Sequence, residues 1–256
     1  MQTMFMKPTV CAAFGAAAML LAGTAQAAGV PGQGTWETTL QPRDLNGDSV
    51  ADAFYDTTLD VTWLRDAKGK GPMNWDAANT WAAGLDVYGV KGWRLPTMID
   101  IGKPGCNFSL SGGKDCGYNV LTKSGDLTKY EKGQKVYSEM AHLFYVTLGN
   151  KAYYAPGTGD WPQPGWGLSN TGSFQNMQSS AYWAGLEYAR APDSAAWIFW
   201  TYSGSQIGYG KDWTYYALAV RNGDVAMVPE AQTYALLMFG LTGLAVVARR
   251  RGLVWR

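Results

Sequence analysis

Two apolar terminal segments bracket this chain and leave one stretch of 202 residues, Ala28 to Pro229, to form a folded core. That length is sufficient for a single domain with its own hydrophobic core. The stretch contains 16 Lys and Arg residues against 19 Asp and Glu residues, a net charge of −3, and no basic helix or patch. We therefore expect no nucleic-acid partner, because the electrostatic attraction that dominates such binding is missing.

The N-terminal segment has the pattern of a secretory signal peptide, residues 1–27. Lys7 supplies a positive charge, Cys11 to Gly23 is apolar, and Ala25-Gln26-Ala27 offers small residues to signal peptidase. The alternative is a permanent membrane helix, for which the apolar run is too short. The sequence therefore predicts export across the inner membrane.

The C-terminal segment is predicted to hold a transmembrane helix over 234–248, which contains 15 uncharged residues. Such a helix is about 22 Å long, shorter than the roughly 30 Å hydrocarbon core, and Trp255 can extend it as an interfacial anchor. The Arg residues that follow stop transfer and place the main domain outside. A core helix is the alternative, but Leu236 to Ala248 carries only Thr242 as a polar residue.

The whole tail, residues 228–256, resembles the PEP-CTERM sorting signal. The resemblance rests on Val228, Pro229 and Glu230, a short spacer, the apolar helix, and a basic cluster of Arg249, Arg250 and Arg251. Ala231 stands where the family usually has proline. The resemblance implies a Gram-negative bacterium that makes exopolysaccharide and an exosortase-type membrane protease that processes the tail. The protein would be held in the inner membrane by its helix, and after processing it would reach the cell surface or matrix.

Two cysteines remain after Cys11 leaves with the signal peptide. Cys106 and Cys116 form an even pair in an oxidising compartment, so we expect a disulfide between them. In the loop-entropy model such a bridge stabilises the fold by roughly 3 kcal/mol.

Helix signals occur in the first half of the stretch. Asn74 is placed to cap a helix that runs to about Leu85. Ser138 is placed to cap a second helix, from Glu139 to Leu148, which Gly149 ends. The segment from Thr97 to Asp100 has the spacing of a capping box and predicts a further short helix.

Strand signals follow. The aromatic and β-branched runs are Tyr182 to Tyr188, Ala196 to Tyr202 and Tyr215 to Arg221, with turns at Gly204 and at Asn222-Gly223. Early helices and a late antiparallel sheet predict a single domain of the α+β class.

Several phrases in this stretch resemble the Lcl C-terminal-domain family. They are Gly92 to Thr97 (GWRLPT), Tyr182 to Gly185 (YWAG), Ala196-Trp197 and Ala219 to Asp224 (AVRNGD). The resemblance covers most of Leu59 to Val225, so we divide the chain into an N-terminal segment (28–58), an Lcl-like domain (59–227) and the sorting tail. Ala184 stands where the family often has Ser, and Asp100 where many members have Glu.

The Lcl resemblance implies a C-type-lectin-like fold and a surface or adhesive role. The founding relatives bind sulfated polysaccharide, but this chain has no Lys/Arg cluster to meet such a ligand. The GWRLPT residues also have a structural interpretation: the guanidinium meets aromatic and backbone acceptors, the leucine packs, the proline fixes φ and the threonine caps a helix. A direct ligand role is the alternative for these residues, which are Trp93, Arg94, Leu95, Pro96 and Thr97.

The segment DLNGDSVAD is a candidate calcium loop. Its oxygen ligands at positions 1, 3, 5, 7 and 9 would come from Asp44, Asn46, Asp48, the carbonyl of Val50, and Asp52. Ser49 replaces the glycine of an EF-hand, and Tyr55 replaces its last glutamate. The alternative is a polar turn in which Asn and Asp cap their own backbone.

Catalytic motifs are missing from the sequence, and the single histidine, His142, falls in a helix pattern that favours packing over catalysis. Aromatic residues are abundant, and Trp161 and Trp166 lie in a Pro/Gly-rich loop (154–172) where their rings can stack on sugars. Core packing is the alternative for the strand aromatics. We therefore expect a non-catalytic surface or matrix protein that binds extracellular polysaccharide. The alternatives are a secreted hydrolase with paired carboxylates and a purely structural matrix component.

Overall fold

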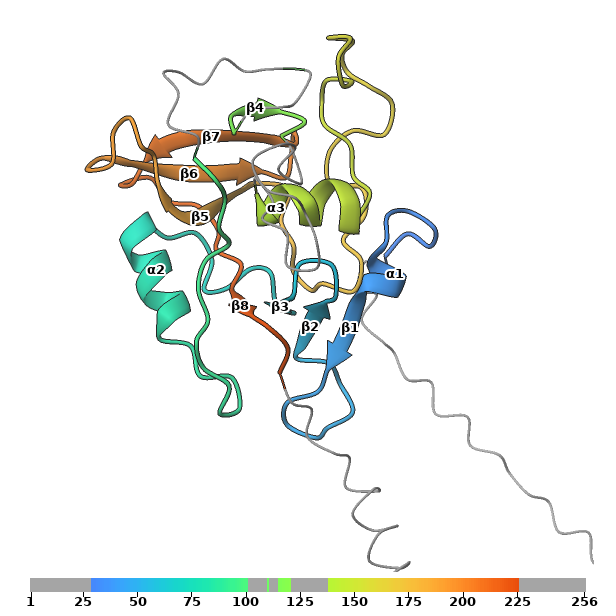
Figure 1. Cartoon of the computed structure of the whole chain (residues 1–256), viewed down its shortest axis with the longest axis vertical. Helices are drawn as coiled ribbons and strands as arrows, with labels where there is room; N and C mark the ends of the chain where they lie inside the picture. Colours follow the sequence, from blue (N-terminus) through green and yellow to red (C-terminus); the bar gives the residue numbers. More distant parts are fainter. Residues whose placement is uncertain (1–28, 101–109, 111–114, 121–137, 226–256) are drawn as a thin grey trace, which may run out of the picture.

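The strands in the described part of the chain form two four-stranded antiparallel sheets, seen at different heights in Figure 1. The computed structural model describes residues 29–100, 110, 115–120 and 138–225. Helices are few and short among these residues. The described chain is therefore mostly antiparallel sheet with some helix, which agrees with the α+β class.

The first sheet has the order β1-β2-β3-β8. Three of its strands are consecutive: β1 (Leu40–Arg43), β2 (Ala53–Asp56) and β3 (Val61–Leu64). The fourth, β8 (Val220–Asn222), comes from the end of the described chain and pairs with β3. The sheet therefore joins residues near the start of the domain to residues near its end.

The second sheet has the order β4-β7-β6-β5. Its strands are β4 (Gly117–Tyr118), β5 (Ala181–Glu187), β6 (Ala195–Trp200) and β7 (Ser205–Gly210). The last three form a meander in which each strand pairs with the next. Gly204, with a φ of +66°, lies in the turn that joins β6 to β7, as the sequence predicts.

The two predicted helix caps are confirmed. Asn74 accepts a hydrogen bond from the Ala77 N–H at the start of α2 (Trp75–Ala83). Ser138 accepts one from the Ala141 N–H at the start of α3 (Glu139–His142). A π-helical turn (Leu143–Thr147) continues α3, and α1 (Trp36–Thr39) is a single turn.

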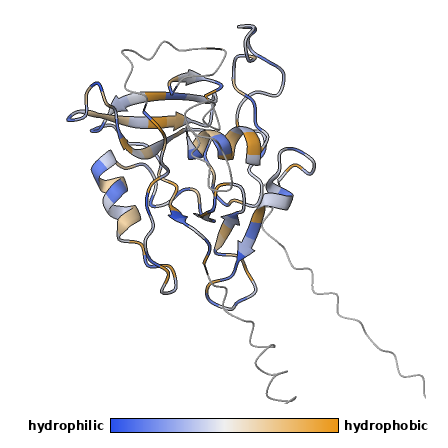
Figure 2. Ribbon diagram, in the orientation of Figure 1, coloured by the Kyte–Doolittle hydropathy of each residue, from blue (hydrophilic) through white to orange (hydrophobic). Residues whose placement is uncertain are grey.

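The second sheet is buried on both faces because its strands are apolar at successive positions. Tyr182 and Phe199 point into the largest core cluster, together with Trp63 of β3 and Phe144 of the π-helical turn. Residues of opposite alternation pack against α2 in a second cluster that includes Ala78, Ala82, Trp183 and Ile198. Hydrophobic residues are accordingly frequent along β5, β6 and α3 in Figure 2.

Three details of the predicted fold are wrong. The region before α2 contains three strands, which lack a clear alternation of exposed and buried residues because the first sheet is largely covered. Strand β7 was missed because its two glycines, Gly208 and Gly210, are typical of turns. The run Tyr215 to Arg221 makes only isolated bridges before β8 begins.

The predicted helix from Thr97 to Asp100 is also absent. The Thr97 carbonyl accepts a hydrogen bond from Glu139 N, and the Asp100 carboxylate accepts hydrogen bonds from Ala189 N and Trp197 Nε1. Asp100 therefore fastens this extended segment to β6 and the β5–β6 turn instead of closing a capping box.

Candidate functional site

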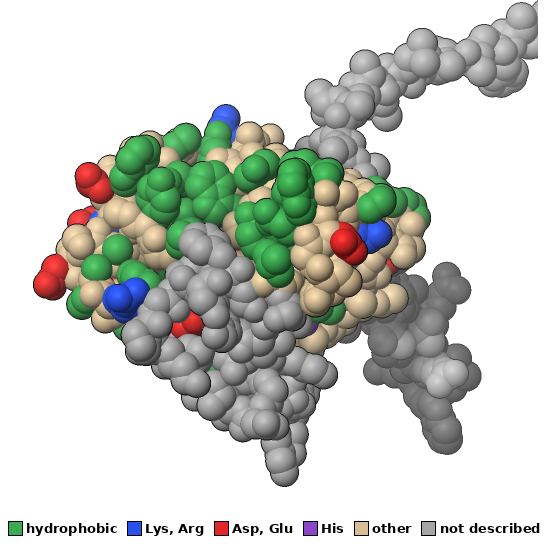
Figure 3. Space-filling view, turned by 90° about the horizontal axis from the view of Figure 1, so that it is seen from above, with side chains coloured by type: hydrophobic (Ala, Val, Ile, Leu, Met, Phe, Trp, Pro, Cys, Tyr) green, Lys and Arg blue, Asp and Glu red, His purple; other side chains and the backbone are tan. Residues whose placement is uncertain are grey.

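A continuous series of aromatic rings runs along the second sheet and the loop beside it. We call it the aromatic series. Neighbouring ring centroids lie 4.6–6.2 Å apart. In order, its members are Trp161, Tyr153, Trp166, Tyr202, Trp200, Tyr215, Tyr209 and Trp213. Figure 3 looks down on the end of the molecule that carries β4 and β7, and hydrophobic side chains gather across this face.

The loop end of the series presents Trp161, whose side chain is 64% exposed. Its ring stacks on Tyr153 at 6.0 Å with an interplanar angle of 27°. The half-buried Trp166 meets Tyr153 edge-on at 4.6 Å and then Tyr202, which is 47% exposed, at 5.8 Å. The prediction that both loop tryptophans are exposed is confirmed for Trp161, whereas Trp166 is half-buried against Tyr153.

Hydrogen bonds hold this loop in shape. The Gln163 amide donates to the carbonyl oxygens of Ala152 (2.6 Å) and Tyr154 (3.0 Å), and Gln163 N donates to Tyr153 O. Tyr153 N donates to Ser203 O, which ties the loop to the β6–β7 turn. The exposed rings are thus presented on a fixed backbone, which lowers the entropy lost when a ligand binds.

The middle of the series is more deeply packed. Trp200 and Tyr209 are half-buried, and each contacts the ring of Tyr215 at 5.6 Å. Burial, reinforced by Tyr209, raises the pKa of Tyr215, so its hydroxyl remains protonated at neutral pH. The middle therefore acts as an uncharged aromatic support between two exposed ends.

The other end of the series is Trp213, which follows β7 and is 57% exposed. The residue before it, Asp212, lines an open pocket of about 400 Å³. The other lining residues are Asn74, Asp76, Asp193, Ser194 and Lys211. The Lys211 ammonium is paired with Glu187 at 2.6 Å and lies 4.4 Å from the centre of the Trp75 ring, so its charge is already compensated.

The sequence did not single out Tyr153, Tyr202 or Trp213 as exposed site residues. The strand pattern of the sequence includes Tyr202, but this residue lies just beyond β6 in the turn. Two local signals indicate these tyrosines. Tyr153 is one of two tyrosines at the start of the Pro/Gly-rich loop, and Tyr202 lies close to Gly204 in a turn. Trp183 and Trp197, by contrast, are buried, as the core interpretation of the strand aromatics holds.

The candidate calcium loop joins β1 to β2 and is folded as a polar turn. The Asp44 carboxylate accepts hydrogen bonds from the N–H groups of Asn46, Gly47 and Ser49. Desolvation raises the pKa of Asp44, but these hydrogen bonds outweigh it and the pKa lies below its ordinary value. In the described part of the chain, no group of three or more His, Cys, Asp and Glu side chains is arranged to hold a metal ion. A calcium site here stays a prediction.

The remaining ligands predicted in this loop also contact the backbone. Asp48 accepts from Val50 N, the amide oxygen of Asn46 accepts from Asp48 N, and Asp52 accepts from Leu45 N. Ser49 adopts a φ of +67°, the conformation for which an EF-hand uses glycine at this position. The loop is thus ordered by its own side chains.

The GWRLPT residues occupy structural positions. Trp93 and Leu95 are buried, and the Trp93 ring donates to Val90 O. Arg94 binds both oxygens of the Glu139 carboxylate at 2.8 Å and also donates to Asn222 in β8. The predicted backbone acceptor is confirmed, since Arg94 also donates to Leu95 O at 3.1 Å, but the Glu139 carboxylate was missed because it is 45 residues away.

The last two residues of the motif complete this arrangement. Pro96 O accepts a hydrogen bond from Gly185 N at 2.7 Å. Thr97 N donates to Glu139 at 2.7 Å, whereas the predicted capping role of Thr97 is wrong. The motif thus connects α3, β5 and β8.

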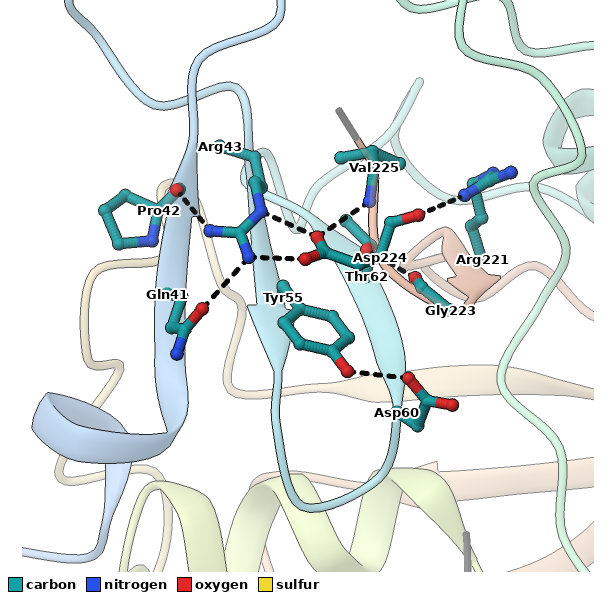
Figure 4. A network of polar contacts seen from close by, with 10 residues as sticks. All are labelled: Gln41, Pro42, Arg43, Tyr55, Asp60, Thr62, Arg221, Gly223, Asp224 and Val225. Carbon is teal, nitrogen blue, oxygen red and sulfur yellow. Dashed lines mark hydrogen bonds and ion pairs between the residues drawn. The ribbon is translucent and has the colours of Figure 1, made fainter. Parts of the chain in front are cut away.

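A second charged network lies where the chain leaves β8 (Figure 4). Arg43 donates to both carboxylate oxygens of Asp224, at 2.6 and 2.7 Å. The pKa of Asp224 lies below its ordinary value, mainly because of the hydrogen bond from Arg43. Nearby, Tyr55 donates to Asp60 at 2.6 Å, and this bond raises the pKa of Tyr55 to about 12.

His142 is buried, as the sequence predicts. Its Nδ1 lies 3.2 Å from the Thr147 hydroxyl, which is 3.4 Å from the buried carboxylate of Asp56. Burial lowers the pKa of His142 to about 4 and raises that of Asp56. These groups lie within the core, without the solvent access that a catalytic base needs.

Cys116 is disulfide-bonded. Its predicted partner, Cys106, lies outside the described residues, as do the predicted signal peptide (1–27) and sorting tail (228–256) with its transmembrane helix. Within the residues that the structure describes, no helix has the length and apolar character needed to cross a membrane.

Comparisons with known proteins give no relative on which to base a function. No protein-family model matches the chain, and a search of curated proteins finds no match. The Lcl and PEP-CTERM resemblances therefore stay proposals that rest on the residues quoted for them.

Proposed function

We propose that this protein is exported, retained at the cell surface or in the extracellular matrix, and binds polysaccharide there without catalysing a reaction. The observation that carries the proposal is the exposed Trp161 ring, which stacks on Tyr153; the Tyr153 ring is in turn contacted edge-on by Trp166. Exposed aromatic faces on an ordered loop suit the apolar faces of sugar rings, because both surfaces lose contact with water at small entropic cost.

The proposed location and fold rest on the two resemblances. An exported domain with a C-type-lectin-like fold fits a surface role, and an exosortase-type protease would release it from its membrane helix. The antiparallel sheets and the disulfide-bonded Cys116 are compatible with both ideas.

The test is binding of the mature protein to extracellular polysaccharide purified from the same bacterium. Trp161→Ala should weaken binding by about tenfold or more, equivalent to about 1.4 kcal/mol or more, as expected for an exposed aromatic anchor. Tyr88→Ala is the matched control, since Tyr88 is 61% exposed but lies in a separate turn outside the aromatic series. Equal binding by both variants and the wild type would reject the role of Trp161.

A secreted hydrolase is the second candidate, and one feature favours it. Asp76, Asp193 and Asp212 line one open pocket, where paired carboxylates would meet a bound glycan. In the same experiment a hydrolase would release new reducing ends, and Asp193→Asn or Asp212→Asn would stop their release. Binding without any release of reducing ends would exclude this candidate.

A further inference from the structure

The aromatic series continues well beyond the loop that carries the proposed function. Tyr202 precedes β7 and Trp213 follows it, so the two exposed rings flank opposite ends of this strand. A strand of six residues extends about 20 Å. The three exposed rings and the half-buried rings that contact them therefore form two platforms: a loop platform (Trp161, Tyr153, Trp166 and Tyr202) and a strand platform (Tyr209 and Trp213).

Strand register connects the two platforms. Trp200 pairs with Ser205, and Tyr209 lies four residues further along β7, so both side chains emerge on the same face of the sheet. Tyr215 lies between them, 5.6 Å from each ring. The two platforms are thus connected by buried and half-buried rings that pack in the α2 cluster.

The orientation of Trp213 is fixed by the end of β7. A Cβ atom at Gly210 would lie 2.8 Å from Asp212 Oδ1 and 3.1 Å from Trp213 Cδ1, so both side chains fold back onto this glycine. The Trp213 ring also meets Tyr209 edge-on at 5.5 Å. An exposed tryptophan that is held from two sides is suited to present its ring to a ligand.

The charges beside the strand platform select the kind of ligand. Asp76, Asp193 and Asp212 line the adjoining pocket, while Lys211 is already paired with Glu187. Carboxylate oxygens accept hydrogen bonds from sugar hydroxyls, but they repel a polymer that carries carboxylate or sulfate groups. The chemistry therefore fits an uncharged glycan.

We propose that the two platforms form one extended site for a long, uncharged polysaccharide strand that occupies both of them at once. This inference rests on the proposed function and specifies its ligand. Once one platform is occupied, the second binds a segment of the same strand at high effective concentration, so a long polymer binds more tightly than its fragments.

The test uses the mature protein with the neutral and the anionic fractions of the bacterium's extracellular polysaccharide. Each fraction is used intact and as oligosaccharides too short to reach along β7. Calorimetry compares the wild type, Trp161→Ala, Trp213→Ala and the Tyr88→Ala control. We expect the intact neutral polymer to bind about tenfold or more weakly to each tryptophan variant. Short neutral oligosaccharides should bind the wild type at two sites, and each variant at one.

The outcomes separate this inference from the proposed function. If Trp161→Ala weakens binding while Trp213→Ala matches the wild type, the loop platform acts alone and the two-platform inference is wrong. Preference for the anionic fraction would reject the uncharged ligand. If the wild type binds neither fraction, the proposed function itself fails. Melting temperatures equal to the wild type would show that both variants fold, as expected for exposed side chains.

Discussion

At the scale of single residues, long-range ion pairs with hydrogen bonds determine how the segments are joined. Arg94 and Glu139 link the GWRLPT segment to α3, and Arg43 and Asp224 link β1 to the end of β8. The guanidinium and carboxylate groups meet through two parallel hydrogen bonds in each pair, the strongest geometry for these partners.

Asp224→Asn should lower the free energy of unfolding by about 1–2 kcal/mol at neutral pH, because it weakens both hydrogen bonds from Arg43. The pKa of Asp224 in the folded state lies below 3.8, so its stabilisation is present above that pH and is lost as the pH falls through the folded-state pKa. Urea unfolding at pH 7 and pH 3 measures both effects. Asp86→Asn is the control, because Asp86 pairs with a largely exposed Lys91 at 3.3 Å. An equal loss in the two variants would contradict the prediction.

Acid should destabilise the protein through His142. Its folded-state pKa of about 4 lies below the ordinary 6.5, so the unfolded chain binds its proton first and stability falls between those values. The full difference is about 3 kcal/mol. Asp56 acts in the opposite sense because its folded-state pKa is raised. His142→Asn should therefore lose less stability than the wild type between pH 6.5 and 4 in urea unfolding. An unchanged pH dependence would show that other groups control acid unfolding.

At the scale of elements, helix ends and tight turns are where close backbone contacts accumulate. Gly149 ends the α3 and π-helical segment with a φ of +65°, and a Cβ there would lie 2.4 Å from Gly34 N. Both features require glycine, the first by conformation and the second by space.

Gly149→Ala should lower the free energy of unfolding by more than about 2 kcal/mol, because both backbone strain and a clash with another backbone segment result. Gly89→Ala is a matched control, since Gly89 has a φ of +87° but nothing within 4 Å of an added Cβ. Denaturant unfolding of both variants isolates the steric contribution as their difference. Similar losses would show that the chain moves aside at Gly34.

The β1–β2 loop leads to a separate prediction about calcium. Millimolar calcium should raise the melting temperature of the mature protein, since oxygen ligands at alternating positions can enclose the ion, and Asp48→Ala should abolish the rise. Asp86→Ala serves as the control for a lost surface carboxylate elsewhere in the chain. No heat of binding and no thermal shift would leave the polar turn as the sole role of the loop.

The same elements show what the sequence can predict. The caps Asn74 and Ser138 are local signals, so both helix starts were predicted, and Trp161 was recognised because a Pro/Gly-rich loop exposes its aromatics. Strand β7 was missed because Gly208 and Gly210 weaken its strand pattern, and the partner of Arg94 was missed because Glu139 is distant in sequence. The aromatic series likewise depends on the order of strands, which no local pattern contains.

At the scale of the whole molecule, we expect the ends of the chain to determine where the domain acts. We predict that the tail is a sorting signal and not only an anchor. A plain anchor needs only an apolar segment and positively charged residues that stop transfer. This tail also carries Pro229 and Glu230, and the proline favours an extended, accessible segment.

Mass spectrometry of mature protein from the native host should therefore show loss of residues 234–256. Glu230→Ala should retain them, with Glu187→Ala as a control outside the tail. Wild-type protein that keeps Arg256 and stays in the inner membrane would show that the tail is an ordinary anchor.

The position of β8 has a consequence for the time course of folding. Whether the chain emerges from the ribosome or from an export channel, its N-terminal part appears first. Strands β1, β2 and β3 are therefore present before β8, the strand that completes their sheet. The Arg43–Asp224 pair spans 181 residues and forms only when almost all of the described chain has passed. Until then Arg43 lacks the carboxylate of Asp224, and the first sheet exposes one edge. The domain should thus become protease-resistant late and abruptly, at the moment its last strand is released.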